Sequence, residues 1–322
     1  MKYRYLAVFL LLSFISSACS PKNTSIPEIG FVDAFEDETI GQARDGFIAA
    51  LEERGFSEDD HTIRIQYRNA QGDIPTLTQI VNYFIAERVD LIATSTTLST
   101  ITAIQRTSDL PIFMMVSPEP KLMQVVDDAG EAPDNLFGVS ESLDYIDTAF
   151  ALIPEYVKPK GDKIVVGMVY NQAEPQSVNA LERMEENARK LGMIIEAVPL
   201  NNSAEAQMIT VSLLNKGIDV FFANPDNTVF AAFETIVKNC NHRNVPIFTS
   251  ESGLVKRGAV AAFGADIYAW GYQAGKQAAE YLSGTDLQDI HIERVRDRKR
   301  VYNAEAAKRF GYDFSTNFEA IE

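Results

Sequence analysis

Short apolar runs alternate along this chain with longer segments in which apolar residues recur every three to four positions. Ile29–Val32 is one such run, and the segment after it has helical spacing up to Arg54-Gly55. The apolar runs are short, β-branched and bounded by polar or glycine-rich turns, as buried strands are. Strands that alternate with helices in this way predict βαβ units, and therefore parallel sheets covered by helices on both faces.

The alternation occurs twice. Residues 28–120 and 163–255 follow the same order of elements, and the spacing from Gly30 to Gly55 equals that from Gly167 to Gly192. Gly55 and Gly192 each stand where a helix would end in a left-handed cap. The remaining matched strands are 62–65 with 194–198, 89–93 with 218–222 and 110–113 with 245–248. Four units in the same order predict two doubly wound α/β lobes.

Ligands of open parallel sheets bind at the carboxyl ends of the strands, where loops lead into helices. Two facing lobes would bring these loops to one cleft. The loops expected there are 33–39, 71–73, 95–98 and 117–119 from the first lobe, and 171–177, 201–204, 224–228 and 250–253 from the second.

Hydroxyl groups gather at one of these loops. Thr94-Ser95-Thr96-Thr97 ends a strand and opens a helix expected over 98–105. Free backbone N–H groups, the positive helix end and the hydroxyls of Ser95, Thr96 and Thr97 favour an anionic group such as a carboxylate. The alternative is a helix N-cap with no ligand.

Carboxylates stand in the loops of the other lobe. Glu174, Asp226 and Glu251 could neutralise an ammonium group while the first lobe holds the acid end of the same molecule. This pattern suits an amino acid or a small zwitterion. Asp226, in Asn224-Pro225-Asp226-Asn227, could instead be a turn or cap residue. Phe35, Tyr170 and Phe263 could form an apolar wall, or could belong to the core.

Catalytic and metal-binding patterns do not occur in the sequence. It has no Gly-x-Ser-x-Gly elbow, no phosphate-binding loop and no Gly-x-Gly-x-x-Gly after the first strand. The three histidines are far apart, and no ligand set for a metal is evident. Cys240 follows an apolar helical run and is expected to be an inert, buried or half-buried thiol. We therefore predict binding without turnover, cofactor or metal.

The N-terminus indicates export. Lys2 and Arg4 precede an apolar run over 6–12, and Ser16-Ser17-Ala18 stands directly before Cys19. We interpret residues 1–18 as a lipoprotein signal peptide, Cys19 as the lipidated first residue and 19–27 as a polar tether. An ordinary cleaved signal, with Cys19 incidental, is the alternative. Either form is exported, to the periplasm or the outer face of a bacterial membrane.

The mature chain is strongly acidic. The signal contains two basic residues and no acid, so its removal takes the net charge from −16 to −18. Nucleic acid is therefore not an expected partner. The most basic stretch, Arg294–Arg300, suits the exposed face of an edge strand, with a docking patch as the alternative.

The order of these residues resembles the substrate-binding proteins of ABC transporters in the tryptophan/tyrosine-binding branch, over about 28–315. The segments that carry the likeness are RDGF at 44–47, NAQGD at 69–73, VDLI at 89–92, YNQAEPQS at 170–177, PDNTV at 225–229 and SESGLVKRGAVAAFG at 250–264. The resemblance implies the periplasmic binding protein type 1 fold, three crossovers between the lobes, no enzyme activity, and delivery of a small ligand to a permease that works with an ATPase.

The resemblance also implies a division of the chain and a set of ligand contacts. Residues 28–143 plus about 266–287 would form lobe 1, 144–265 plus about 288–316 lobe 2, and 317–322 a tail. By position, the residues facing the ligand would be Thr97, Tyr170, Glu174, Ser177, Asp226, Asn227 and Glu251.

The first lobe departs from the family pattern. It has Ala34-Phe35-Glu36-Asp37-Glu38 where relatives tend to have an aromatic followed by Val-Glu-His-Pro. It also has Leu98 in place of a proline, and Pro118-Glu119-Pro120 in place of Thr-Asp-Pro. The identity of the ligand therefore stays open. A sensor subunit for a membrane receptor is the alternative function, and an exported enzyme with Glu174 and Asp226 as paired carboxylates is a third.

Overall fold

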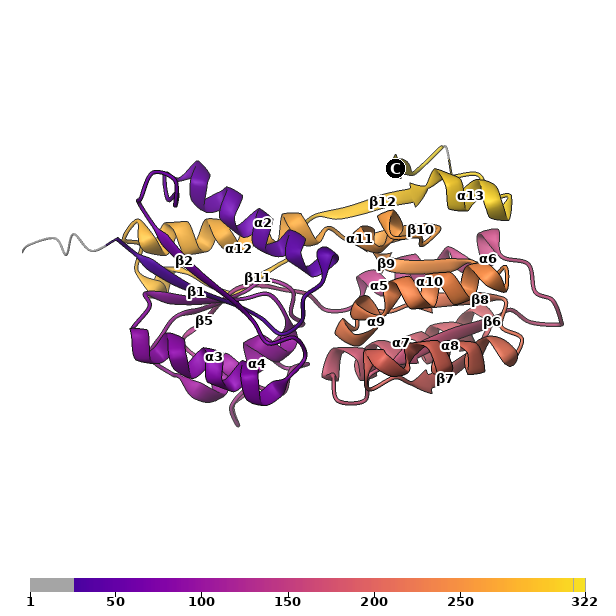
Figure 1. Ribbon diagram of the computed structural model, residues 1–322, viewed down its shortest axis with the longest axis horizontal. Coiled ribbons are helices and arrows are strands. Elements are labelled where there is room, and N and C mark those ends of the chain that lie inside the picture. Colours follow the sequence, from indigo (N-terminus) through magenta and orange to yellow (C-terminus); the bar gives the residue numbers. More distant parts are fainter. Residues whose placement is uncertain (1–25, 315, 322) are drawn as a thin grey trace, which may run out of the picture.

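A computed structural model describes residues 26–314 and 316–321. The predicted signal peptide, Cys19 and all but the end of the tether lie outside the described residues. In Figure 1 two lobes lie side by side, each built on a twisted sheet. This arrangement confirms the predicted fold class of two doubly wound α/β lobes.

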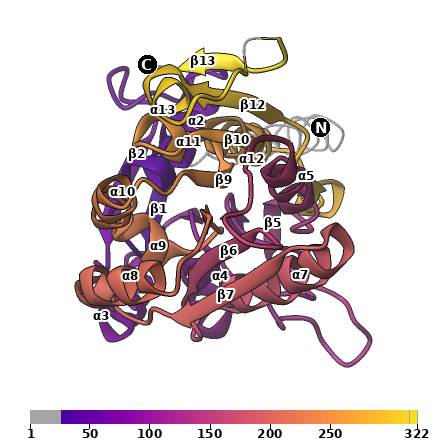
Figure 2. The same cartoon turned by 90° about the vertical axis from the view of Figure 1, so that its right-hand side faces the viewer.

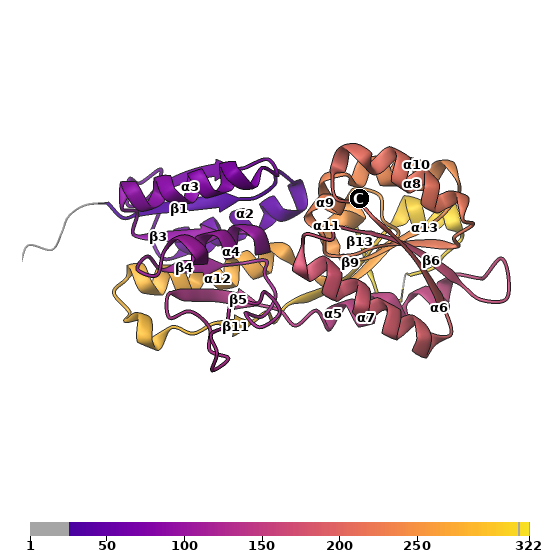
Figure 3. The ribbon, with the colours of Figure 1, turned by 90° about the horizontal axis from the view of Figure 1, so that it is seen from below.

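The first sheet has the strand order β11-β5-β4-β3-β1-β2, with parallel neighbours throughout. Its strands are β1 (Glu28–Asp33), β2 (Arg64–Asn69), β3 (Leu91–Thr94), β4 (Ile112–Met114), β5 (Leu136–Ser140) and β11 (Glu293–Arg294). Helices α2 (Glu38–Glu53) and α12 (Ile267–Leu282) cover one face, while α3 (Ile74–Glu87) and α4 (Thr97–Arg106) cover the other (Figures 1 and 3). Both faces are therefore buried, as the apolar strands predict.

The second sheet has the order β13-β12-β10-β9-β8-β6-β7, and only β12 with β10 is antiparallel. The strands are β6 (Val165–Tyr170), β7 (Ile194–Pro199), β8 (Val220–Ala223), β9 (Ile247–Glu251), β10 (Ala261–Ala265), β12 (Arg298–Asn303) and β13 (Glu319–Ile321). The helices of this lobe are α5 (Tyr145–Ala151), α6 (Ile153–Tyr156), α7 (Pro175–Leu191), α8 (Ala206–Asn215), α9 (Asn227–Ala231), α10 (Phe233–His242), α11 (Ser252–Lys256) and α13 (Ala304–Phe310), with the short 3-10 turn η1 (Ser203–Glu205). A second 3-10 turn, η2 (Leu287–Asp289), precedes β11 in the first lobe.

The two predicted helix caps are present. Gly55 follows α2 with φ of 84°, and Gly192 caps α7 with φ of 71°. Residues with a Cβ rarely adopt a positive φ, so glycine is the residue suited to both positions. Helices α2 and α12 also pack closely, since a Cβ on Gly271 would lie 1.8 Å from the carbonyl oxygen of Ala43.

The chain crosses between the lobes three times, near 141–145, 265–267 and 295–298. The last crossing comes later than about 288, the predicted point, because β11 pairs with β5 of the first sheet before β12 enters the second. The prediction of a tail over 317–322 is wrong for its described part. β13 pairs with β12, as Figure 2 shows at the upper edge of the second lobe.

The basic stretch lies on strand edges, as predicted. Arg294 belongs to β11, the edge strand of the first sheet, and Arg298–Arg300 of β12 pair with β10 alone, because β13 pairs with β12 only at Val301–Asn303. Its cations have partners within the chain: Arg294 with Glu119, Arg296 with Glu293, Arg298 with Asp144 and Lys299 with Asp266. The fifth cation, Arg300, lies over the ring of Phe263, with its guanidinium carbon 4.2 Å from the ring centroid. Cys240 is buried, as predicted, and burial raises the pKa of its thiol to about 12, which disfavours the reactive thiolate.

Candidate ligand-binding site

A cavity lies between the lobes at the carboxyl ends of the strands, where the predicted loops meet. The space among its lining atoms, open solvent included, is about 360 Å³. We call it the inner cavity. It is lined from the first lobe and its crossovers by Ile40, Thr97, Val116, Ser117, Pro118, Glu141, Leu143 and Trp270, and from the second lobe by Tyr145, Gln176, Pro225, Asp226, Asn227 and Phe230.

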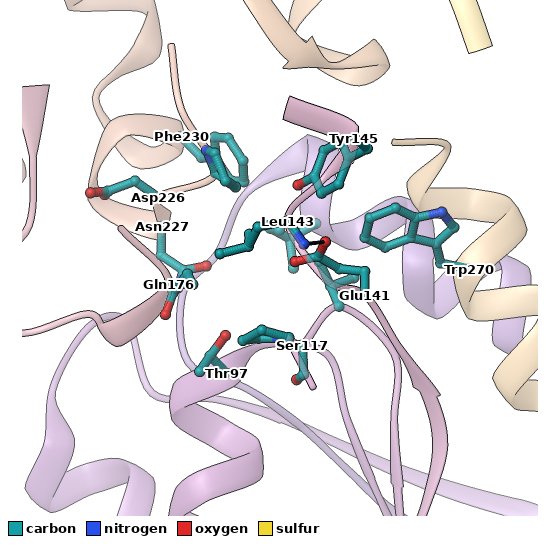
Figure 4. A pocket seen from close by; sticks show the side chains of 14 residues that line it. Thr97, Ser117, Glu141, Leu143, Tyr145, Gln176, Asp226, Asn227, Phe230 and Trp270 are labelled. Carbon is teal, nitrogen blue, oxygen red and sulfur yellow. Dashed lines mark hydrogen bonds between the residues drawn. The ribbon is translucent and has the colours of Figure 1, made fainter. Parts of the chain in front are cut away.

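The hydroxyl cluster is used mainly within the first lobe. Thr96 is the N-cap of α4 and forms a capping box with Ser99, and Ser95 donates a hydrogen bond to Asp33. Thr97 is the residue of the predicted trio that lines the inner cavity, at the first turn of α4 (Figure 4). The capping interpretation therefore holds for Thr96, while Thr97 and the positive end of α4 face the cavity.

Asp226 both lines the inner cavity and caps α9. Its Oδ1 accepts a hydrogen bond from Val229 N at 2.9 Å, and its Oδ2 accepts from Asn171 N at 2.6 Å and from the Ser177 hydroxyl. Burial raises the pKa of its carboxyl group, and these donors lower it. Asp226 therefore has the role of a cap residue that the sequence left open. Ser177 donates a hydrogen bond to Asp226 and does not line the cavity.

Glu174 joins the starts of α7 and α9. Its carboxyl group accepts hydrogen bonds from Asn227 N at 3.0 Å, Asn227 Nδ2 at 2.8 Å, Thr228 Oγ1 at 3.1 Å and Asn171 Nδ2 at 3.1 Å. Burial, followed by the nearby Asp226, raises its pKa to about 8. With its oxygens occupied in this way, Glu174 positions Asn227, which lines the inner cavity.

Gln176 was not predicted from the sequence. It is buried, with 6% of its surface exposed, and lines the inner cavity at the start of α7. Its Nε2 donates to Glu174 Oε2, whereas its Oε1 is buried and has no hydrogen-bond partner among the described residues. An unpaired buried acceptor is costly, so this oxygen is suited to a ligand donor.

A second carboxyl group lies on the opposite side of the cavity. Glu141 follows β5 at the first crossover and lines the cavity beside Tyr145 and Trp270 (Figure 4). Glu251, which was predicted to face the ligand, instead accepts hydrogen bonds from Tyr145 Oη at 2.7 Å and Ser250 Oγ at 3.0 Å. Burial raises the pKa of Glu251 to about 7. It therefore supports the cavity wall from behind.

The remaining predicted residues lie farther out. Phe35 and Glu174 line a larger groove of about 1560 Å³ that includes open solvent, between α3 and α4 on one lobe and the loops before α7 and α8 on the other. Tyr170 is half-buried at the end of β6 and lines neither space. The residues that sequence analysis missed are Ser117, Glu141, Tyr145, Gln176, Phe230 and Trp270. Ser117 and Gln176 stand in predicted loops, 117–119 and 171–177. Glu141 and Trp270 carry no local signal, because they follow crossovers.

An ion pair joins the lobes beside the cavity. Arg257, which follows α11, donates from Nη1 to Asp37 Oδ2 at 2.6 Å and to Thr39 Oγ1 at 3.1 Å on the first lobe. Its Nη2 donates to the carbonyl oxygen of Phe230, a cavity residue, at 2.7 Å. The side chains of Arg257 and Asp37 are 10% and 2% exposed. The lobes are thus in contact around the cavity.

Two doubly wound lobes that enclose one cavity at their strand ends define a two-lobed solute-binding protein. The family model described as ABC transporter substrate binding protein matches residues 28–319. The chain belongs to this family, as the sequence resemblance implied, and is a binding protein of the periplasmic binding protein type 1 fold and not an enzyme.

Three relatives illustrate the similarity. A tyrosine-binding protein of Clostridioides difficile (strain R20291) is 31% identical over 87% of this chain and 79% of its own length. The ligand-free, open structure of a substrate binding protein with adhesive properties from Clostridium difficile is 28% identical, covers 92% of this chain and 99% of its own, and has a TM-score of 0.66. An ABC domain from Streptococcus pneumonia in complex with L-Trp is 22% identical, covers 92% of this chain and 100% of its own, and has a TM-score of 0.82.

Within the described residues, no helix has the length and apolar character needed to cross a membrane. The same part of the chain has no group of three or more His, Cys, Asp or Glu residues arranged to hold a metal ion.

Proposed function

We propose that this protein is the lipid-anchored receptor of an ABC importer and binds an aromatic amino acid in the inner cavity. The wall formed by Tyr145, Phe230 and Trp270 supports an aromatic side chain. The name of the tyrosine-binding relative supports the same class of ligand. Cys19 would carry the lipid, and the ligand would pass to a permease driven by an ATPase.

The amino-acid backbone would lie across the cavity, between the lobes. The positive end of α4 at Thr97 and the Ser117 hydroxyl suit a carboxylate. On the second lobe, Gln176 Oε1 suits an ammonium group. Asp226, whose oxygens already accept hydrogen bonds from Val229 N, Asn171 N and Ser177, would contribute its charge nearby. The observation that carries the proposal is the unpaired oxygen of Gln176, because an ammonium group would supply the donor it lacks.

Calorimetric titration with the standard amino acids tests the proposal. Gln176→Met keeps the length of the side chain and removes both its acceptor and the Nε2 donor to Glu174. It should weaken binding of tyrosine or tryptophan about tenfold to a hundredfold. Indole-3-propionate, which lacks the ammonium group, should bind wild type and variant equally weakly. Gln172→Met, at an exposed residue of the same loop, is the matched control and should leave binding unchanged.

Two results would contradict the proposal. One is a wild-type protein that binds none of the amino acids. The other is a folded Gln176→Met variant that binds them as tightly as wild type.

A further inference from the structure

The carboxyl group of Glu141 is held in one position at the inner cavity. Glu141 is 4% exposed and directly follows β5, and its Oε2 accepts a hydrogen bond from Leu143 N. The interactions found for the described residues use this one oxygen, so Oε1 is left for the cavity. Figure 4 shows the carboxyl group on the side of Tyr145 and Trp270, across from Asp226, Asn227 and Gln176.

The aromatic neighbours of Glu141 do not offer polar groups of their own to a ligand. Tyr145 Oη donates to Glu251 at 2.7 Å, and Trp270 Nε1 donates to the carbonyl oxygen of Asp297 at 3.2 Å. The two rings meet edge to face with centroids 5.6 Å apart. With both polar edges bonded elsewhere, this end of the cavity is an apolar slot in which Glu141 supplies the polar atom.

The surroundings of Glu141 disfavour its charged form. Burial raises the pKa of its carboxyl group well above the usual range, and Glu251 and Asp144 raise it as well, while Leu143 N and Arg298 lower it. Burial therefore shifts this carboxyl group toward its uncharged form. In either form Oε1 keeps a lone pair that can accept a hydrogen bond from an N–H or O–H of the ligand.

We propose that Glu141 determines specificity at the end of the ligand remote from its amino-acid backbone, by accepting a hydrogen bond from an N–H or O–H on the aromatic ring. This inference rests on the proposed function, because it takes the amino-acid backbone to lie between Thr97 and Gln176. A ring without such a donor leaves the buried oxygen unpaired, so the site rejects it more strongly than its smaller contact area alone would require.

Two ligand pairs that differ in one donor test the assignment. Phenylalanine lacks the hydroxyl of tyrosine, and 3-benzothienylalanine replaces the indole N–H of tryptophan with sulfur. The wild-type protein should bind the donor-bearing member of at least one pair at least about tenfold more tightly. In Glu141→Leu, which has a similar volume and no acceptor, that preference should disappear. Glu141→Gln keeps an acceptor and should retain most of it.

Each outcome decides the matter. Equal binding within both pairs by the wild type overturns the assignment and needs no variant, so poor folding of Glu141→Leu does not prevent the test. A preference that persists in folded Glu141→Leu also overturns it. Failure of the proposed function is distinct: in that case no member of either pair binds, with or without the ring donor.

Discussion

The ion pair between Arg257 and Asp37 should hold the lobes together when ligand is bound. Arg257→Met removes both interlobe hydrogen bonds, the 2.6 Å bond to Asp37 and the 3.1 Å bond to Thr39, and keeps an unbranched chain over the Phe233 ring. In the closed form Asp37 would remain buried without its counter-charge. In an open form water would solvate it, so the variant should favour opening over unfolding.

The expected change in the free energy of closure follows from the hydrogen bonds lost and the charges returned to water. A hydrogen bond to a charged group is worth about 1.5–3 kcal/mol, and opening returns both charges to water, so we expect a net loss of about 1.5–3 kcal/mol from the closed form. Ligand binds the closed form, so its dissociation constant should rise about tenfold to a hundredfold. The substitution also removes hydrogen bonds within the second lobe, from Arg257 to the carbonyl oxygen of Phe230 and to Glu234. The melting temperature of the ligand-free protein should therefore fall as well, and the effect on closure is the loss of affinity and of compactness measured on the folded variant.

Titration calorimetry with L-tyrosine and L-tryptophan measures the affinity, and small-angle scattering measures closure. Saturated Arg257→Met should be less compact than the saturated wild type. Glu234→Gln is the matched control: Glu234 binds the same arginine within the second lobe at 2.7 Å but is 68% exposed, so its loss should cost at most about 1 kcal/mol. Unchanged affinity in Arg257→Met together with a lower melting temperature would show that the pair supports the fold and not closure.

Two further predictions concern pH and the anchor. The pKa of Glu251 is raised to about 7 by burial, so the folded protein holds its proton more tightly than the unfolded chain, and this contribution to stability is lost as pH rises from about 4.5 through 7. Glu251→Gln should therefore reduce the loss of unfolding free energy between pH 5 and pH 8 by about 2–3 kcal/mol in urea titrations, and an unchanged slope would refute this. Cys19→Ala should move the protein from the membrane to the soluble fraction with ligand binding intact, and retention in the membrane would exclude lipidation at Cys19.

The structure also alters what we expect of Asp226. From the sequence, exchange of Asp226 for Asn affects ligand binding and hardly affects folding. In the structure the carboxylate accepts two backbone N–H groups and a hydroxyl, and an Asn side chain would turn an amide group toward some of these donors. Loss of stability is therefore part of the expected result, which makes Gln176 the better probe of the ligand.

The sequence by itself determined the two lobes, the order of their strands and helices, and the edge of each sheet where loops gather. These features depend on neighbours along the chain: apolar periodicity selects strand or helix, and residues such as Gly55 and Gly192 end the helices. Thr97 was found in this way because it stands at a strand-to-helix junction. The family resemblance rested on the same local segments.

Tertiary structure alone decided which polar side chains are free for a ligand. Ser95, Ser177 and Glu251 have suitable side chains and stand in the expected loops. Each, however, forms a hydrogen bond with a residue 49 to 106 positions away in the sequence. Glu141 and Trp270 both line the cavity although 129 positions separate them, because each lies in or directly after a segment that crosses between the lobes. A buried polar group forms a hydrogen bond with the donor or acceptor that the fold places beside it. The local sequence pattern does not show which distant segment will supply that partner.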